Sequence, residues 1–222
     1  MSNDPTTQVI PSGVSPDAAR LLERAYALDG AESSRALYRD WAETYDETML
    51  QGLRYLSPGK VADLLEAHLP DRTAAVLDIG CGTGLCGHGL AAHGFTTIDG
   101  LDVSPEMMEV AARLGAYRHF LAADLNQPLD IASDSYAGMS CSGTFTHGHV
   151  DARCLDELFR VLAPGAPFAF TVKREVWESL GFKDKLAALI EGGRIVQRAW
   201  QLDCHYSSSA QPDGVFCVYA KV

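Results

Sequence analysis

The hydrophobic pattern divides the chain into two parts. Up to residue 70, apolar residues recur at steps of three and four, which predicts helices over residues 16–28, 33–50 and 57–69. Ser57 followed by Pro58 is typical of a helix start, and Pro70 is typical of a helix end. Since no strand pattern interrupts these segments, we expect residues 1–70 to form a helical region that begins with a polar tail.

Beyond residue 71, short apolar runs alternate with segments of helical periodicity. Strands are predicted at 74–79, 95–101, 117–122, 136–141 and 166–172, and helices at 85–93, 104–114 and 151–162. Continuous apolar runs are typical of parallel strands that are buried on both faces. The alternation therefore predicts an α/β fold, in which a doubly wound, mostly parallel sheet carries helices on both sides.

The C-terminal part has a different pattern. Residues 194–204 and 215–222 are rich in β-forming residues, and only a short polar segment separates them. This connection is too short for a crossover helix, so at least one of the strand pairs must be antiparallel. We expect a hairpin added to the edge of the sheet.

Composition narrows the class of protein. Hydrophobic residues make up 47% of the 222, enough for a core, while the net charge of −11 disfavours nucleic acid and anionic membranes as partners. The six cysteines show neither a C-x-x-C pair nor a zinc-binding spacing, which favours buried thiols in a reducing compartment. The first residues are polar, and no apolar run approaches the length of a membrane span. We therefore expect a cytoplasmic protein without a signal peptide, a transmembrane helix or a bound metal.

The candidate chemistry lies where three successive strands end. Gly80, Gly82 and Gly84 stand between the first strand and its helix, where glycine allows a ligand to approach the backbone closely. Asp102 ends the second strand, and a carboxylate there can accept hydrogen bonds from both hydroxyls of a ribose. Asp124 follows the third strand, where its carboxylate or the neighbouring backbone can contact the edge of an adenine.

Two ligands compete for this arrangement. Residues 82–87 match G-x-G-x-x-G with Asp102 twenty residues beyond Gly82, which is also typical of an NAD(P)-binding oxidoreductase. Asp78 argues against a dinucleotide, because a carboxylate beside the loop repels a pyrophosphate and attracts a cationic ligand. S-adenosylmethionine, with its adenosine and its positively charged amino-acid end, fits better. A protein that binds this cofactor without transferring a group remains a further alternative.

Four runs carry a resemblance to a known family: VLDIGCGTG at 76–84, LDVSPEM at 101–107, ADL at 123–125 and LDELFRVLAPG at 155–165. They resemble the successive motifs of class I S-adenosylmethionine-dependent methyltransferases, and the resemblance covers nearly all of residues 35–222. LYRDWAETYD at 37–46 and GTFTHGHV at 143–150 further resemble the methyltransferase-like protein of the Williams–Beuren syndrome region and its bacterial relatives.

This resemblance implies a fold, a reaction and a set of contacts. It implies one methyltransferase domain over residues 1–222, with a Rossmann-like, seven-stranded catalytic core at 71–222 and a helical lid within 1–70. It implies S-adenosylmethionine as cofactor, S-adenosylhomocysteine as product and a small-molecule acceptor. The methionine end would lie at residues 78–84, the ribose at Asp102, the adenine at residues 103–107 and 124–125, and the sulfur above residues 140–142. The expected cofactor-binding residues are Tyr38, Trp41, Tyr45, Asp78, Gly80, Cys81, Gly82, Thr83, Gly84, Asp102, Val103, Ser104, Met107, Asp124, Leu125, Ser140 and Cys141.

Methyl transfer itself needs alignment of the acceptor and exclusion of water. Tyr38, Trp41 and Tyr45 suit the second role, although the same spacing also suits plain core residues. A general base is needed only when the acceptor loses a proton. His147 and His149 are the only imidazoles in the segment after the fourth strand, so they are the candidate catalytic residues, and polar loop residues are the alternative.

Overall fold

The computed structural model describes residues 55–146, 150–207 and 212–222, together with 40–46 and the single positions Arg20, Arg24, Leu37 and Met49. Most of the two helices predicted at 16–28 and 33–50 lies outside these residues. Within 40–46, a short 3₁₀ helix, η1, spans Ala42–Thr44 and packs against α5, which spans Pro105–Ala112.

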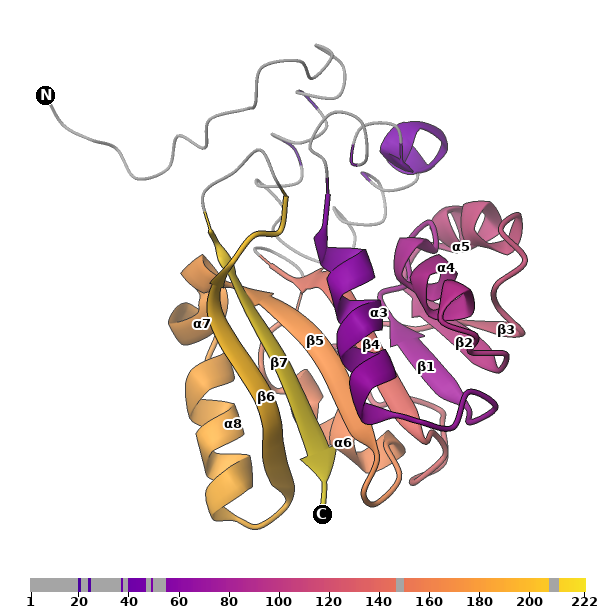
Figure 1. The fold of residues 1–222 in the computed structure, drawn as a ribbon. Coiled ribbons are helices and arrows are strands. Elements are labelled where there is room, and N and C mark those ends of the chain that lie inside the picture. The colour runs from indigo at the N-terminus through magenta and orange to yellow at the C-terminus, as the bar shows by residue number, and fades with distance from the viewer. Residues whose placement is uncertain are drawn as a thin grey trace, which may run out of the picture.

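Seven strands form one sheet in the order β3-β2-β1-β4-β5-β7-β6 (Figure 1). The strands are β1 (Val76–Ile79), β2 (Ile98–Asp102), β3 (His119–Ala122), β4 (Gly138–Phe145), β5 (Pro167–Lys173), β6 (Ile195–Cys204) and β7 (Gly214–Lys221). The first five pair in parallel, whereas β7 is antiparallel to both β5 and β6. The predicted seven-stranded, mostly parallel sheet with a C-terminal antiparallel hairpin is confirmed.

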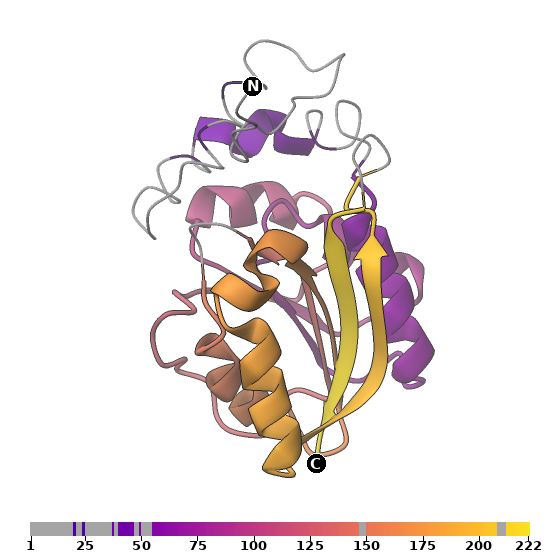
Figure 2. The ribbon, with the colours of Figure 1, turned by 90° about the vertical axis from the view of Figure 1, so that its left-hand side faces the viewer.

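Helices cover both faces of the sheet (Figure 2). They are α3 (Ser57–His68), α4 (Leu85–Ala92), α5, α6 (Cys154–Val161), α7 (Arg174–Ser179) and α8 (Phe182–Glu191). Side chains of α3 and α4 form a core with Val76 of β1, while those of α6, α7 and α8 form a second core with Leu77 and Ile79. The period-two alternation of a strand thus divides β1 between the two layers.

Three details of the chain differ from the sequence-based prediction. The segment between β5 and β6 contains α7 and α8, which were not predicted although Phe182, Leu186 and Leu189 lie at helical spacing and are buried. β4 extends to Phe145, four residues beyond the predicted end, because a bulge with Gly143 at φ +77° lets the pairing resume. Ser57 does not cap α3 but lies in its first turn, and its hydroxyl is hydrogen-bonded to that of Ser142 at 2.6 Å.

Among the residues described, no helix is long and apolar enough to cross a bilayer.

Candidate cofactor site

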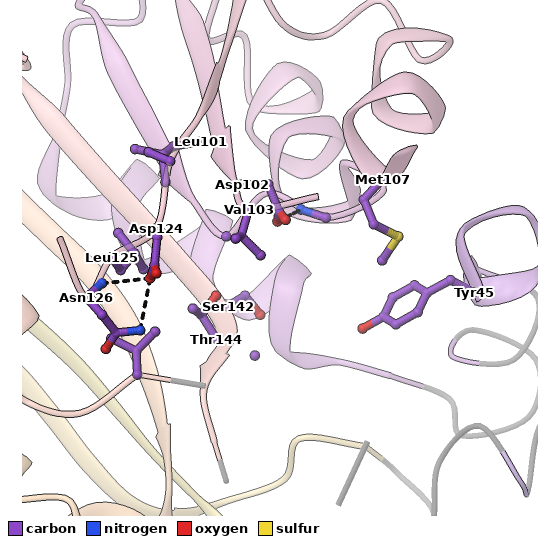
Figure 3. A pocket seen from close by; sticks show the side chains of 15 residues that line it. Tyr45, Leu101, Asp102, Val103, Met107, Asp124, Leu125, Asn126, Ser142 and Thr144 are labelled. Atoms are coloured by element: carbon purple, nitrogen blue, oxygen red, sulfur yellow. Dashed lines mark hydrogen bonds between the residues drawn. The ribbon is translucent and has the colours of Figure 1, made fainter. Parts of the chain in front are cut away.

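A pocket opens where the parallel strands end, at the edge of the sheet to which ligands bind in open α/β folds. The space within it is about 720 Å³ when the open solvent at its mouth is included. Its lining residues are Tyr45, Gly80, Gly82, Leu101, Asp102, Val103, Met107, Ala123, Asp124, Leu125, Asn126, Ser142, Gly143, Thr144 and Val150. Figure 3 shows Tyr45 pointing into the open space from the side opposite Asp124 and Thr144.

Asp102 is the carboxylate most firmly fixed on the pocket wall. Its Oδ2 accepts a hydrogen bond from the backbone N–H of Gly82 at 2.8 Å, and its Oδ1 accepts one from Ser104 N–H at 2.9 Å. Burial raises the pKa of Asp102, and these two backbone donors counteract the rise. Since a carboxylate has about four acceptor positions, Asp102 keeps further capacity toward the pocket.

The glycine loop lies against the end of β4. Gly80 has φ +62°, and a side chain there would overlap Thr144 Oγ1. Both the backbone conformation and the space therefore require glycine at this position. The close approach brings the loop backbone and Thr144 into the same pocket wall.

Asp78 lies behind the loop and does not line the pocket. Only 1% of it is exposed, and its carboxylate accepts hydrogen bonds from Ser140 Oγ at 2.6 Å and Tyr117 Oη at 2.7 Å. Burial raises the pKa of Asp78 to about 6, against the effect of these donors. Asp78 therefore does not attract a cationic ligand directly, as the sequence had suggested, because its carboxylate faces hydroxyls inside the protein.

Asp124 and its neighbours form the wall below the end of β3. The Asp124 carboxylate accepts hydrogen bonds from both the backbone and the side-chain amide of Asn126, each at 2.9 Å (Figure 3). This local turn fixes the direction of the carboxylate. Leu125 and Met107 add apolar surface to the same pocket.

The N-terminal helical segment reaches the pocket through Tyr45. Trp41 is 1% exposed and lies edge-on to the Tyr45 ring, with centroids 4.9 Å apart, so it supports Tyr45 from the core rather than lining the pocket. Thr83 Oγ1 donates a hydrogen bond to Asp46, which ties the segment to the glycine loop. Burial raises the pKa of Asp46.

The remaining predicted residues surround the pocket or lie outside the described part. Gly84 is the N-cap of α4, and five predicted residues are buried beside the lining residues: Cys81, Thr83, Ser104, Ser140 and Cys141. Ser104 caps α5, since its Oγ accepts a hydrogen bond from Met107 N–H at 3.3 Å. Tyr38, His147 and His149 lie outside the described residues.

Ser142, expected beside the sulfur, lines the pocket, whereas these lining residues were missed from the predicted cofactor-binding set: Leu101, Ala123, Asn126, Gly143, Thr144 and Val150. Most of them adjoin a predicted residue, so extending each motif by one or two positions would have found them. The part played by residues 142–144 depends on the bulge in β4, for which the sequence offers only Gly143 as a signal.

Comparison with known proteins agrees with this geometry. The family model described as a methyltransferase domain matches residues 76–165. Methyltransferase-like protein 27 of Homo sapiens is 29% identical over 182 residues, which are 81% of this chain and 73% of that protein. The malonyl-[acyl-carrier protein] O-methyltransferase of Serratia marcescens is 31% identical over 102 residues, 43% of this chain and 37% of that protein.

The fold also has solved counterparts. The structure of DhpI in complex with S-adenosylhomocysteine superposes with a TM-score of 0.61 at 18% identity, covering 86% of this chain and 96% of that one. The strand order and these matches show the Rossmann-like fold of solved methyltransferases, with residues 76–165 matching a methyltransferase domain. Together these findings support a class I S-adenosylmethionine-dependent methyltransferase that uses S-adenosylmethionine as its cofactor.

Proposed function

We propose that the protein transfers the methyl group of S-adenosylmethionine to a small-molecule acceptor. The observation that carries this proposal is a concave pocket that joins an adenosine-type wall, around Asp102, to a polar end of β4, around Ser142 and Thr144. The net charge of −11 further disfavours a polyanionic acceptor such as nucleic acid.

The pocket offers a matching group for each part of the cofactor. We assign the ribose hydroxyls to the free acceptor capacity of Asp102, and the adenine ring to the apolar side chains of Val103 and Met107. Leu125 and Asp124 lie where the amino edge of the adenine would end. The backbone at Gly80 and Gly82 suits the methionine end, because it presents no side chain to the pocket.

When bound, the cofactor supplies a methyl group already activated on a sulfonium sulfur. The protein then has to align an acceptor and keep water away. Tyr45 suits the second task, since its ring enters the pocket from the side opposite β4. The acceptor would approach from residues 142–144, and we assign any proton removal to His147 or His149, which follow β4 in the chain.

The experiment is a methyl-transfer assay with isotopically labelled S-adenosylmethionine. The acceptor panel contains hydroxylated, carboxylic, amine and thiol compounds, with S-adenosylhomocysteine release and mass gain of the acceptor as readouts. Transfer to at least one class supports the proposal. Binding of S-adenosylhomocysteine without transfer to any class would favour a non-catalytic cofactor-binding protein.

The two histidines are tested within the same assay. His147→Ala and His149→Ala should leave the affinity for S-adenosylhomocysteine within about twofold of wild type, because they follow the acceptor side of the pocket. One of them should lower turnover by roughly 100-fold if it removes a proton. Loss of cofactor affinity in both variants would instead place this loop beside the donor.

A further inference from the structure

A chain of buried hydrogen bonds runs behind the glycine loop, outside the pocket. The backbone N–H of Gly87 donates to Tyr117 Oη at 3.2 Å, and Tyr117 Oη donates to Asp78 Oδ2 at 2.7 Å. Ser140 Oγ donates to the other carboxylate oxygen, Oδ1, at 2.6 Å. The chain thereby connects α4, the segment before β3, β1 and β4.

Tyr117 supplies a hydrogen-bond acceptor to the start of α4, which lacks a side-chain cap. The N-cap of α4 is Gly84 at φ +95°, so the helix begins without a side-chain cap. Gly87 is the third residue of the helix, and the N–H at this position is one that an N-cap side chain ordinarily satisfies. The hydroxyl of Tyr117 accepts this hydrogen bond from a site thirty residues away in the chain.

The glycines of the loop make room for this tyrosine. A Cβ on Gly87 would overlap the ring and hydroxyl of Tyr117, and a Cβ on Gly84 would lie 3.1 Å from the ring. The ring also packs against that of Phe120, with centroids 5.0 Å apart. The G-x-G-x-x-G spacing at 82–87 therefore accommodates a tyrosine side chain in this protein.

The groups facing Asp78 determine how the chain responds to pH. Ser140 and Tyr117 donate to its carboxylate, the thiol of Cys86 also contributes, and the negative charge of Asp102 lies nearby. Tyr117 donates its hydroxyl proton to Asp78. Burial and the negative charge of Asp78 keep the pKa of Tyr117 well above its usual value. A protonated Asp78 needs a hydrogen-bond acceptor of its own, so protonation conflicts with donation from both hydroxyls.

We infer that Tyr117 is a positioning residue of the cofactor site: through Asp78 and Gly87 it fixes the glycine loop between β1 and α4. Gly80 and Gly82 of that loop line the pocket, so a displaced loop changes the backbone surface that the cofactor meets. The inference rests on the cofactor site and is independent of the acceptor.

The test compares two tyrosine-to-phenylalanine variants that each remove one buried bond to an aspartate. Tyr117→Phe removes the hydroxyl, and with it both the bond to Asp78 and the acceptor for Gly87 N–H, while it keeps the ring. Tyr136→Phe is the matched control, because Tyr136 Oη donates to Asp99 Oδ2 at 2.9 Å and neither residue lines the pocket. Affinity for S-adenosylhomocysteine is measured by calorimetry between pH 5 and 8.

Tyr117→Phe should weaken binding by at least about tenfold at pH 7.5, because it loses a hydrogen bond to a charged group and the acceptor for Gly87 N–H. The pH at which affinity falls should also move upward, because Asp78 loses a donor that favours its charged form. Tyr136→Phe should keep both the wild-type affinity and the wild-type midpoint. A merely structural role for Tyr117 would lower the melting temperature without moving this midpoint.

Gly87→Ala provides a second test if Tyr117→Phe does not fold. Alanine favours a helix by roughly 1 kcal/mol over glycine, so this change should be harmless unless the space is needed for Tyr117. We expect it to weaken binding at least as much as Tyr117→Phe. The inference would be overturned, and the proposed function kept, if Tyr117→Phe had the affinity and the pH midpoint of wild type. Wild-type binding by Gly87→Ala would have the same consequence. A wild-type protein that does not bind S-adenosylhomocysteine would overturn the proposed function as well.

Discussion

The three aspartates at the ends of the first three strands have different surroundings, and these surroundings separate their roles. Asp102 faces the pocket and is held by two backbone N–H groups. Asp78 is enclosed and accepts from two hydroxyls. Asp124 lies at the pocket wall in a local turn with Asn126. Only the first and last are placed to contact a ligand directly.

Removing the Asp102 carboxylate should weaken cofactor binding strongly. Two hydrogen bonds to a charged group contribute about 1.5–3 kcal/mol each, so Asp102→Ala should reduce the affinity for S-adenosylhomocysteine by at least about tenfold. Asp102→Asn retains one acceptor oxygen and should be milder. Isothermal titration calorimetry checks both variants, and unchanged affinity in Asp102→Ala would refute the assignment of the ribose to this residue.

Asp78 should make stability depend on pH. Burial raises its pKa from the ordinary 3.8 to about 6 in the folded protein. Between about pH 4 and 6 the folded state therefore keeps a proton on Asp78 that the unfolded state has lost. As pH rises through this window, the contribution of Asp78 to the free energy of unfolding decreases by about 3 kcal/mol. Asp78→Asn cannot titrate, so between pH 4.5 and 7.5 the unfolding free energy of wild type should fall by about 2 kcal/mol relative to that of the variant. Urea unfolding at pH 4.5 and 7.5 measures it, and a constant difference would contradict the prediction.

At the scale of elements, the segment 40–46 is the part most directly placed to cover the pocket. It contacts α5 through η1, contributes Tyr45 to the lining and is tied to the glycine loop by Asp46 and Thr83. β1, in contrast, lies in the middle of the sheet with all four residues buried. The segment has fewer supports than β1, and elements that close on ligands come from the less stable part of a fold.

The cofactor should therefore slow hydrogen exchange in this segment. We expect the amides of residues 40–46 to exchange quickly without S-adenosylhomocysteine and slowly with it, while those of residues 76–84 are protected in both states. Tyr45→Ala should weaken binding, and Tyr45→Phe should retain most of it because the ring is kept. Equal exchange of residues 40–46 in both states, measured by mass spectrometry, would rule out a lid.

The fold was more predictable than the contacts of its site. The strands of the sheet and the hairpin follow from local apolar runs, and the period of β1 places Asp78 on the same face as Val76. The hydrogen bond from Tyr117 to Asp78 could not be predicted, because it joins residues 39 positions apart through packing that no local pattern records. The lining role of Thr144 depends likewise on a bulge in β4. α7 and α8 had a local signal and were overlooked.

At the scale of the whole molecule, the central question is whether the pocket binds S-adenosylmethionine or a dinucleotide. The same glycine spacing serves dinucleotides in other folds, where the start of the helix meets a pyrophosphate. Here the third N–H of α4 is satisfied by Tyr117, which is bonded in turn to a buried carboxylate. The region behind the loop is thus already occupied by protein groups and a negative charge.

The most direct measurement is the thermal shift of the 222-residue protein with S-adenosylhomocysteine and, separately, with NAD. A ligand present at 100 times its Kd stabilises a protein by about 2.7 kcal/mol, which is roughly 5–10 °C in Tm for a domain of this size. The account predicts this shift with S-adenosylhomocysteine and none with NAD at the same concentration. A shift with NAD and none with S-adenosylhomocysteine would contradict it.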